Sequence, residues 1–379
     1  MIIMKKLFVM LSVALIVAGC DGRKSAEELF NETSSGVVVV LNEYYYELML
    51  PNGGKLYFTG LDENGDISGL TADVKEAQAK RAMLTGTAFF IDDKGTMMTN
   101  RHVARPDIDA VTARRSMIKI LKIMKLYISD EMTSLTQQFM SLENEKSSCM
   151  YTDYYGYVHT DEERLSQINA MQYELGRRFD ALKQTSDEID GNIDPEGIRI
   201  QTVCELGIAY NNTFVTTDRD FLEKNPCVVV RTSDKDDVDL ALLQLKNKKT
   251  PEGTHVFRLR GDDDGGNLIT RLFTDSGDDG PLKIDQQLYM IGYNAGLVLA
   301  NTKQGIKVQM TSGKVTQLPD GQRLLYSIPT LQGSSGSPVI DEYGNLVAVN
   351  FAKLGRSEEH TSDLQSPGEG VCRRGRGKR

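Results

Sequence analysis

Short runs of β-branched, aliphatic and aromatic residues recur along most of this chain and set the limits on its fold. The first, Val37–Leu41, is continuously apolar, which is typical of a buried strand. Gly, Asn, Asp and Pro separate it from the runs that follow. Those runs are Tyr44–Leu50, Lys55–Thr59, Thr87–Ile91, Ile198–Ile208, Cys227–Val230, Leu240–Leu245, Leu288–Ile291, Gly305–Met310, Leu324–Ile328, Val339–Ile340 and Leu346–Phe351. Many short strands joined by turns predict an all-β barrel or sandwich.

One long stretch breaks this β pattern. Across Asp107–Glu145 and again across Glu162–Leu182, apolar residues recur at spacings of three and four, as on one face of a helix. The Tyr- and Gly-rich segment Cys149–His159 separates the two runs. We expect residues of about 107–190 to form a long antiparallel helical hairpin, coiled-coil in character, in which each apolar stripe buries the other. It is expected to bind a protein partner or limit access to a cleft, with passive decoration as the alternative.

The N-terminus has the features of an export signal. Two lysines precede the apolar segment Leu7–Val17, which is too short for a comfortable membrane span. The sequence Val17-Ala18-Gly19-Cys20 then resembles the lipobox of bacterial lipoproteins. That resemblance implies that residues 1–19 are removed, that Cys20 carries the lipid, and that residues 20–33 tether an exported protein to a bacterial envelope membrane, on its periplasmic or cell-surface side. An ordinary signal peptide with a chance cysteine is the alternative.

The C-terminal segment differs from everything before it. From Arg356 the stretch RSEEHTSDLQS resembles the translation of a common sequencing adapter, and a Gly/Arg-rich run follows. We expect residues 356–379 to be non-native and the last folded domain to be truncated. The alternative is a disordered basic tail.

Charge and cysteine content narrow the classes of partner. The net charge is -9 and no basic face stands out, which argues against nucleic acid. Cys204 and Cys227 lie in neighbouring strand-like runs and could pair, or both could be buried free thiols. No Cys/His spacing indicates a metal site, so we expect neither a metal nor an organic cofactor.

Three local patterns carry the chemistry. The first is Gly86–Ile91, a turn, and then Met97–Val103, which predicts a β-hairpin whose second strand ends at His102. Histidine is the usual general base because imidazole titrates near neutral pH. The second is Asp237–Leu243, where an apolar run begins directly after Asp239. This order favours Asp239 as a carboxylate at the mouth of a strand.

Two alternatives stay open for that acidic segment. The neighbouring Asp236 and Asp237 could be mistaken for the functional carboxylate, and the whole segment could be a solvated acidic turn.

The third pattern is Gly333–Ile340, with the letters GSSGSPVI. Its glycines allow a tight turn that exposes Ser335 and directs backbone N–H groups at one point.

In this order the three patterns resemble the trypsin-like serine peptidases. The first is similar to the histidine motif of the Htr branch, and the Ser-Gly-Ser-Pro letters of the third are similar to the glutamyl-endopeptidase branch. The resemblance implies a mainly β, chymotrypsin-type fold of two six-stranded-type barrels, with the helical hairpin inserted in the first. The first barrel would span residues 34–250 and the second residues 251–355.

The same resemblance implies a serine endopeptidase that cleaves proteins or peptides through an acyl-enzyme, without a cofactor. His102, Asp239 and Ser335 would form the catalytic triad, and the N–H groups of Gly333 and Ser335 the oxyanion hole. Digestive trypsins carry an aspartate before the nucleophile that pairs with a newly cut N-terminus. Ser334 stands there, so that activation switch is absent.

Specificity is only weakly indicated. The segment with Pro329 and Thr330 is expected to line one wall of the substrate pocket, and the strand with Val349 and Asn350 another. Neither wall supplies a carboxylate, which favours a small or medium apolar residue over Lys or Arg. The alternative function is a catalytically inactive lipoprotein of this fold that binds proteins through its helical hairpin. A purely structural coiled-coil lipoprotein would leave the three motifs unexplained.

Overall fold

Six strands of the first half of the chain close into a β-barrel. In the computed structural model, which describes residues 23–235, 238–258, 282–320 and 323–351, strand β1 pairs with both β5 and β9, and this double pairing closes the sheet. An additional strand, β2, pairs with the last residues of β1, Tyr46–Met49, beyond the part of β1 that pairs with β5. The strands are β1 (Val37–Met49), β2 (Lys55–Phe58), β5 (Ala82–Phe90), β6 (Thr96–Thr99), β9 (Arg199–Tyr210), β10 (Pro226–Thr232) and β11 (Ala241–Leu245).

The continuous apolar run at the start of β1 is explained by burial on both faces. Val38 and Val40 pack inside the barrel with Phe90 and Met97. Their neighbours Val37, Val39 and Leu41 pack on the opposite face, in a cluster that also holds residues of the second sheet. Because successive side chains of a strand point to opposite faces, a strand between two cores must be apolar at every position.

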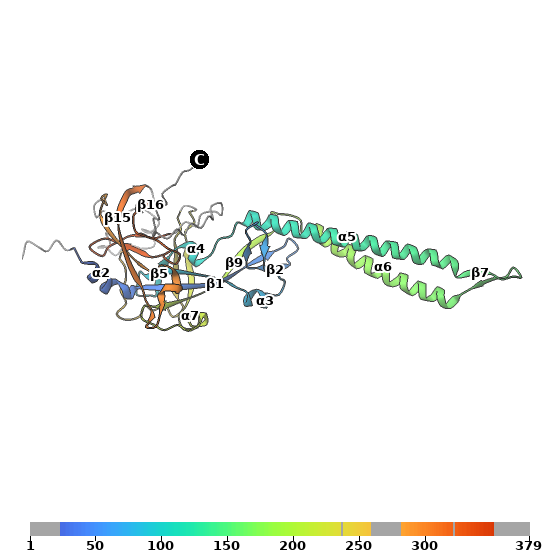
Figure 1. Cartoon of the computed structure of the whole chain (residues 1–379), viewed down its shortest axis with the longest axis horizontal. Coiled ribbons are helices and arrows are strands. Elements are labelled where there is room, and N and C mark those ends of the chain that lie inside the picture. The colour runs from blue at the N-terminus through green and yellow to red at the C-terminus, as the bar shows by residue number, and fades with distance from the viewer. Residues whose placement is uncertain (1–22, 236–237, 259–281, 321–322, 352–379) are drawn as a thin grey trace, which may run out of the picture.

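The second sheet is an open, five-stranded half-barrel in the described part of the chain. Its order is β16-β15-β12-β17-β18. The long strand β15 was predicted only at its start, because its side chains are largely polar and exposed. The strands are β12 (Gln287–Gly292), β15 (Gln309–Asp320), β16 (Arg323–Tyr326), β17 (Pro338–Ile340) and β18 (Leu346–Val349). The two sheets lie side by side at one end of the molecule (Figure 1).

The predicted helical hairpin projects far from the first barrel (Figure 1). Helix α5 (Ala110–Ser148) runs outward and α6 (Glu162–Asp190) returns against it. At 1.5 Å per residue, α5 is about 58 Å long. The tip is a two-stranded ribbon of β7 (Met150–Thr152) and β8 (Val158–Thr160), where the sequence predicted only a loop. Asp109 and Asp161 cap the two helices by accepting backbone N–H groups.

The root of the hairpin is part of the folded core. Met117 and Leu121 of α5 are buried in one cluster with Tyr46 and Leu48 of β1 and with Phe58 of β2. The helices are therefore anchored on the outer half of β1, beyond the barrel itself. Burial of an aliphatic side chain of this size contributes about 1.5–3 kcal/mol to stability.

The N-terminal segment that was predicted to be a tether is bound to the fold from Lys24 onward and is helical over Ala26–Thr33. The Lys24 N–H donates to the carbonyl of Glu342, and Ser25 and Glu28 form a capping box at the start of α2 (Ala26–Thr33). Leu29 is fully buried in the cluster between the two sheets. Helix α2 lies at the end of the molecule opposite to the hairpin tip (Figure 1).

Short elements complete the described chain. They are η1 (Ser34–Gly36), β3 (Gly60–Leu61), β4 (Ile67–Ser68), α3 (Val74–Ala79), α4 (Arg101–Ala104), α7 (Asp218–Lys224), α9 (Gly296–Ala300), β13 (Asn301–Thr302) and β14 (Gly305–Ile306). Cys149, Cys204 and Cys227 are free thiols. Across the described ranges, no helix has the length and apolar character that crossing a bilayer requires.

Several predictions fall on residues outside the described ranges. These are the signal peptide at residues 1–19, the lipid site Cys20, the alternative carboxylates Asp236 and Asp237, and the segment 356–379.

Candidate active site

His102 lies in a short helix that directly follows β6. The sequence predicted a strand that ends at the histidine, but β6 ends at Thr99 and helix α4 then spans Arg101–Ala104. The buried side chain of Asn42 explains the turn, since its Nδ2 donates to the carbonyls of Val103 (2.8 Å) and Ala104 (3.1 Å). Carbonyls at the end of a helix otherwise lack partners. Asn42 of β1 therefore fixes the helix that carries His102.

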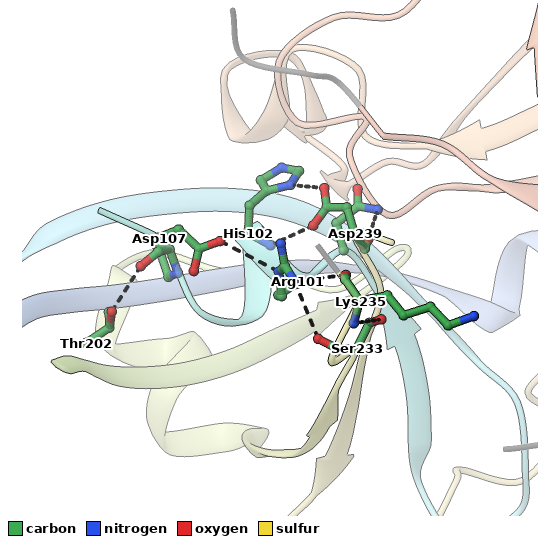
Figure 2. A network of polar contacts seen from close by, with 9 residues as sticks. Arg101, His102, Asp107, Thr202, Ser233, Lys235 and Asp239 are labelled. Atoms are coloured by element: carbon green, nitrogen blue, oxygen red, sulfur yellow. Dashed lines mark hydrogen bonds and ion pairs between the residues drawn. The ribbon is translucent and has the colours of Figure 1, made fainter. Parts of the chain in front are cut away.

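Asp239 holds His102 at two points. Its Oδ2 lies 2.5 Å from His102 Nδ1, and its Oδ1 accepts the backbone N–H of His102 at 3.0 Å (Figure 2). The Asp239 carbonyl accepts Asn100 Nδ2 at 2.8 Å. Burial acts to raise the pKa of Asp239, but the hydrogen bonds and charge of His102 outweigh it and leave this pKa below its ordinary value. An ionised carboxylate at this position favours the tautomer with the proton on Nδ1, which leaves Nε2 unprotonated.

The loop that carries Ser335 is hydrogen-bonded to β5, which pairs with β6, the strand that leads to His102. The N–H of Thr87 in β5 donates to the Ser335 carbonyl at 2.8 Å, and the Thr87 hydroxyl donates to the Gly333 carbonyl at 2.9 Å. The hydroxyl of Thr99 at the end of β6 donates to the Thr87 carbonyl at 2.7 Å. Among the described residues, hydrogen bonds join His102 to Asp239 but not His102 to Ser335. In unliganded enzymes such a bond often tightens only when substrate binds.

The loop around Ser335 requires glycine at two positions. Gly333 and Gly336 have φ values of +95° and +87°. A Cβ on Gly333 would lie 2.3 Å from the N atom of Gly296, and one on Gly336 would lie 2.0 Å from the Thr87 carbonyl oxygen. A side chain at Gly336 would therefore force the loop away from β5, and one at Gly333 would force it away from Gly296.

Two backbone N–H groups of this loop are left free. Gly333 and Ser335 are both buried, yet within the described part of the chain neither N–H donates a hydrogen bond. Buried backbone donors are nearly always paired, so two unpaired ones in adjacent turns mark a place where an external acceptor can bind. An oxyanion hole needs such an arrangement.

Ser337, which stands where glycine is commoner, lies against a glycine, Gly292. A Cβ on Gly292 of β12 would lie 1.9 Å from Ser337 Oγ. The larger residue in the loop is thus accommodated because its neighbour has no side chain. The two positions are 45 residues apart, and no local pattern in the sequence links them.

The four predicted pocket residues differ in their exposure. Pro329 and Thr330 are exposed, Val349 is half-buried, and Asn350 is only 2% exposed. The amide of Asn350 is bound to Ser334 and Tyr326 inside the protein. Contact of these residues with substrate stays a prediction.

Arg101 is a site residue that sequence reasoning missed. Its Nη1 donates to the carbonyls of Ser233 (3.4 Å) and Lys235 (3.3 Å), which belong to the segment before Asp239 (Figure 2). Its Nε lies 3.6 Å from Asp107 Oδ2. The only signal in the sequence was the charge next to His102. In the described ranges, no group of three His, Cys, Asp or Glu residues could hold a metal ion.

The closed barrel beside an open half-barrel, with a long helical insertion in the first, fits a chymotrypsin-like double-barrel fold. Residues 196–349 match the sequence family described as the trypsin-like peptidase domain. That part of the chain is therefore similar to trypsin-like peptidase domains. It includes Asp239 and Ser335, whereas His102 lies on the other side of the helical hairpin and outside the matched range.

The other comparisons add little. The structure described as the crystal structure of Deg5 aligns at 14% identity over 87% of this chain and 87% of that chain, with a TM-score of 0.33. A similarity of this size carries no argument about fold or function. No curated protein matches the sequence.

Proposed function

We propose that this protein is a serine endopeptidase whose catalytic triad is His102, Asp239 and Ser335. The proposal rests above all on the two-point contact by which the Asp239 carboxylate orients the His102 ring and backbone. The free N–H groups of Gly333 and Ser335, in the loop that is hydrogen-bonded to β5, provide the second requirement, which is a site for the oxyanion. Neither metal nor organic cofactor enters the mechanism.

The proposed reaction follows from these positions. His102 Nε2 takes the proton of the Ser335 hydroxyl as its Oγ attacks a peptide carbonyl. The Gly333 and Ser335 N–H groups bind the oxyanion of the tetrahedral intermediate. His102 then gives the proton to the leaving amine, and the C–N bond breaks to leave an acyl-enzyme. Water hydrolyses that ester by the same proton route, which restores the serine.

The test uses the full chain with Cys20→Ser, casein as a general substrate and a fluorophosphonate probe. We expect cleavage and labelling, both abolished by Ser335→Ala. Ser166→Ala, an exposed serine of α6, is the matched control and should change neither. Cleavage that survives Ser335→Ala would exclude this mechanism.

We also propose that Cys20 carries a lipid and holds the protein at a bacterial envelope membrane. Lys24, only four positions later, is already bound to Glu342, so a lipid on Cys20 would keep the β domains close to the bilayer. Because α2 and the hairpin tip lie at opposite ends, the hairpin would extend away from that anchor. Metabolic labelling with a fatty acid should mark the wild type and not Cys20→Ser.

A second candidate function is supported by the tip of the hairpin, which would act as a protein-binding surface. Tyr154, Tyr155 and Tyr157 are 98%, 82% and 70% exposed. Tyrosine supplies large contact area at low entropic cost and is enriched in interfaces. If the protein is catalytically inactive, binding of a partner at this surface would be its only function. A folded wild type that neither cleaves nor reacts with the probe, but whose pulled-down partner is lost on Tyr→Ser substitution at the tip, would favour that alternative.

A further inference from the structure

Asn350 is the most thoroughly bound buried polar side chain around the Ser335 loop. It follows β18 directly and is 2% exposed. Its Nδ2 donates to the carbonyl of Ser334 at 2.9 Å and to the Ser334 hydroxyl at 3.1 Å. Its Oδ1 accepts the hydroxyl of Tyr326 at 2.7 Å. A buried amide with its donor and its acceptor both engaged is strongly fixed in orientation.

The backbone of Asn350 holds the other side of the same loop. Its N–H donates to the Ser337 carbonyl and its carbonyl accepts the Gly336 N–H, each at 2.8 Å. Asn350 thus binds the residue before Ser335 and the two residues after it. No charged group takes part in these contacts.

The bond to the Ser334 carbonyl determines where the Ser335 N–H points. These two groups belong to one planar, trans peptide unit, so they point in opposite directions. While Asn350 Nδ2 holds the carbonyl on the inner side, the Ser335 N–H must face outward, free for an oxyanion. The Ser337 N–H also donates to the Ser334 carbonyl, at 3.1 Å, so Asn350 provides one of two restraints.

Tyr326 connects this restraint to the far edge of the second sheet. It ends β16, whereas Asn350 follows β18, and these are the two edge strands of the half-barrel. The hydrogen bond between the two side chains therefore links both edges behind the nucleophile. Burial raises the pKa of the Tyr326 phenol, which favours the protonated form that donates this hydrogen bond.

We infer that Asn350 is a positioning residue that holds the oxyanion-hole peptide in its active orientation, with Tyr326 as its support. The inference rests on the proposed peptidase function. The neutral amide of Asn350 would hold this peptide in place, as an aspartate paired with a new N-terminus does in digestive trypsins. The oxyanion hole is then formed on folding, without proteolytic activation. This role differs from that of a pocket wall, where Asn350 would contact substrate.

Steady-state kinetics separate these two roles. We expect Asn350→Ala and Asn350→Asp to lower kcat about tenfold to a hundredfold and to change KM less than about twofold. The aspartate variant turns an oxygen toward the Ser334 carbonyl. The expected effect is smaller than the loss of one complete oxyanion donor, which lowers kcat about 10²–10³-fold. Tyr326→Phe should lower kcat several-fold in the same way. Asn345→Ala, a half-buried asparagine in the β17–β18 turn, is the matched control and should leave kcat unchanged. A raised KM or altered residue preference with unchanged kcat would overturn the inference.

A crystal structure of Asn350→Ala provides a readout that does not depend on activity. We expect the Ser334–Ser335 peptide to turn, so that the Ser335 N–H no longer faces the same side as that of Gly333. An unchanged peptide overturns the inference whether or not the wild type cleaves. A wild type that does not react with the fluorophosphonate probe, by contrast, would remove the proposed function and leave this structural result standing.

Discussion

Arg101 and Asp107 form an ion pair, with Nε and Oδ2 3.6 Å apart, that connects helix α4, which carries His102, to the foot of the long hairpin. Arg101 directly precedes His102, and Asp107 lies three residues before the start of α5. The same guanidinium reaches the carbonyls of Ser233 and Lys235 before Asp239. One side chain thus meets the two chain segments that carry the proposed base and its carboxylate.

The carbonyl contacts of Arg101 should matter more than its ion pair. Asp107 is 67% exposed, and exposed pairs contribute little, so Asp107→Asn should leave kcat within about twofold of wild type. Arg101→Met removes the hydrogen bonds to the Asp239 segment and should lower kcat about tenfold. Steady-state kinetics with circular dichroism as a folding check test both variants. An equal loss in the two variants would contradict this ranking.

The triad should behave as a unit. Ser335→Ala and His102→Ala should each lower kcat by a factor on the order of 10⁶, and the double variant by little more. Asp239→Asn should lower kcat about 10⁴-fold, because the amide favours the wrong tautomer of His102. Multiplicative effects in the double variant would show that the two residues act separately.

The depressed pKa of Asp239 predicts how its contribution to stability depends on pH. A carboxyl whose pKa is lower in the folded than in the unfolded chain stabilises the fold above the unfolded value, about 3.9, and loses that contribution as pH falls through the folded value. Asp239→Asn should therefore lower the urea midpoint at pH 6 by more than at pH 3. Equal losses at both pH values would contradict the lowered pKa.

Gly336 should tolerate no side chain. Gly336→Ala places a methyl group 2.0 Å from the Thr87 carbonyl oxygen, whereas Gly253→Ala at a similar positive φ meets no atom within 4 Å. Gly253→Ala should cost about 1–2 kcal/mol for the left-handed backbone alone. Gly336→Ala should cost about 1–3 kcal/mol more from overpacking and should abolish cleavage. Denaturant melts of the two variants give the difference.

The outer part of the hairpin should be dispensable for folding. Arg178 of α6 donates to Glu131 of α5, so a short Gly/Ser loop can replace residues 132–177 at this level. The root cluster with Met117 and Leu121 stays intact, and the melting temperature should fall by only a few degrees. Removing residues of about 107–190 instead exposes Tyr46, Leu48 and Phe58, and should destabilise the first barrel strongly. Equal stability of the two deletions would show that the root does not support the core.

The sequence by itself determined the elements whose signals are local. The two hairpin helices were predictable from a 3.6-residue period, β1 and most later strands from apolar runs between turn residues, and the three motifs from a few adjacent letters each. His102 and Asp239 could be paired in advance only through the resemblance, because 137 positions separate them.

Only the tertiary structure decided the features that depend on contacts between distant positions. Closure of the barrel by β1 and β9, the capping of α4 by Asn42, the fit of Ser337 against Gly292, and the hold of Asn350 on Ser334 all join segments that no short window contains. Most of strand β15 was missed because its polar side chains carry no apolar pattern, and its register comes from β12 and β16. Local patterns record what a residue requires of its neighbours in the chain. Packing and buried hydrogen bonds depend on which segments meet in space.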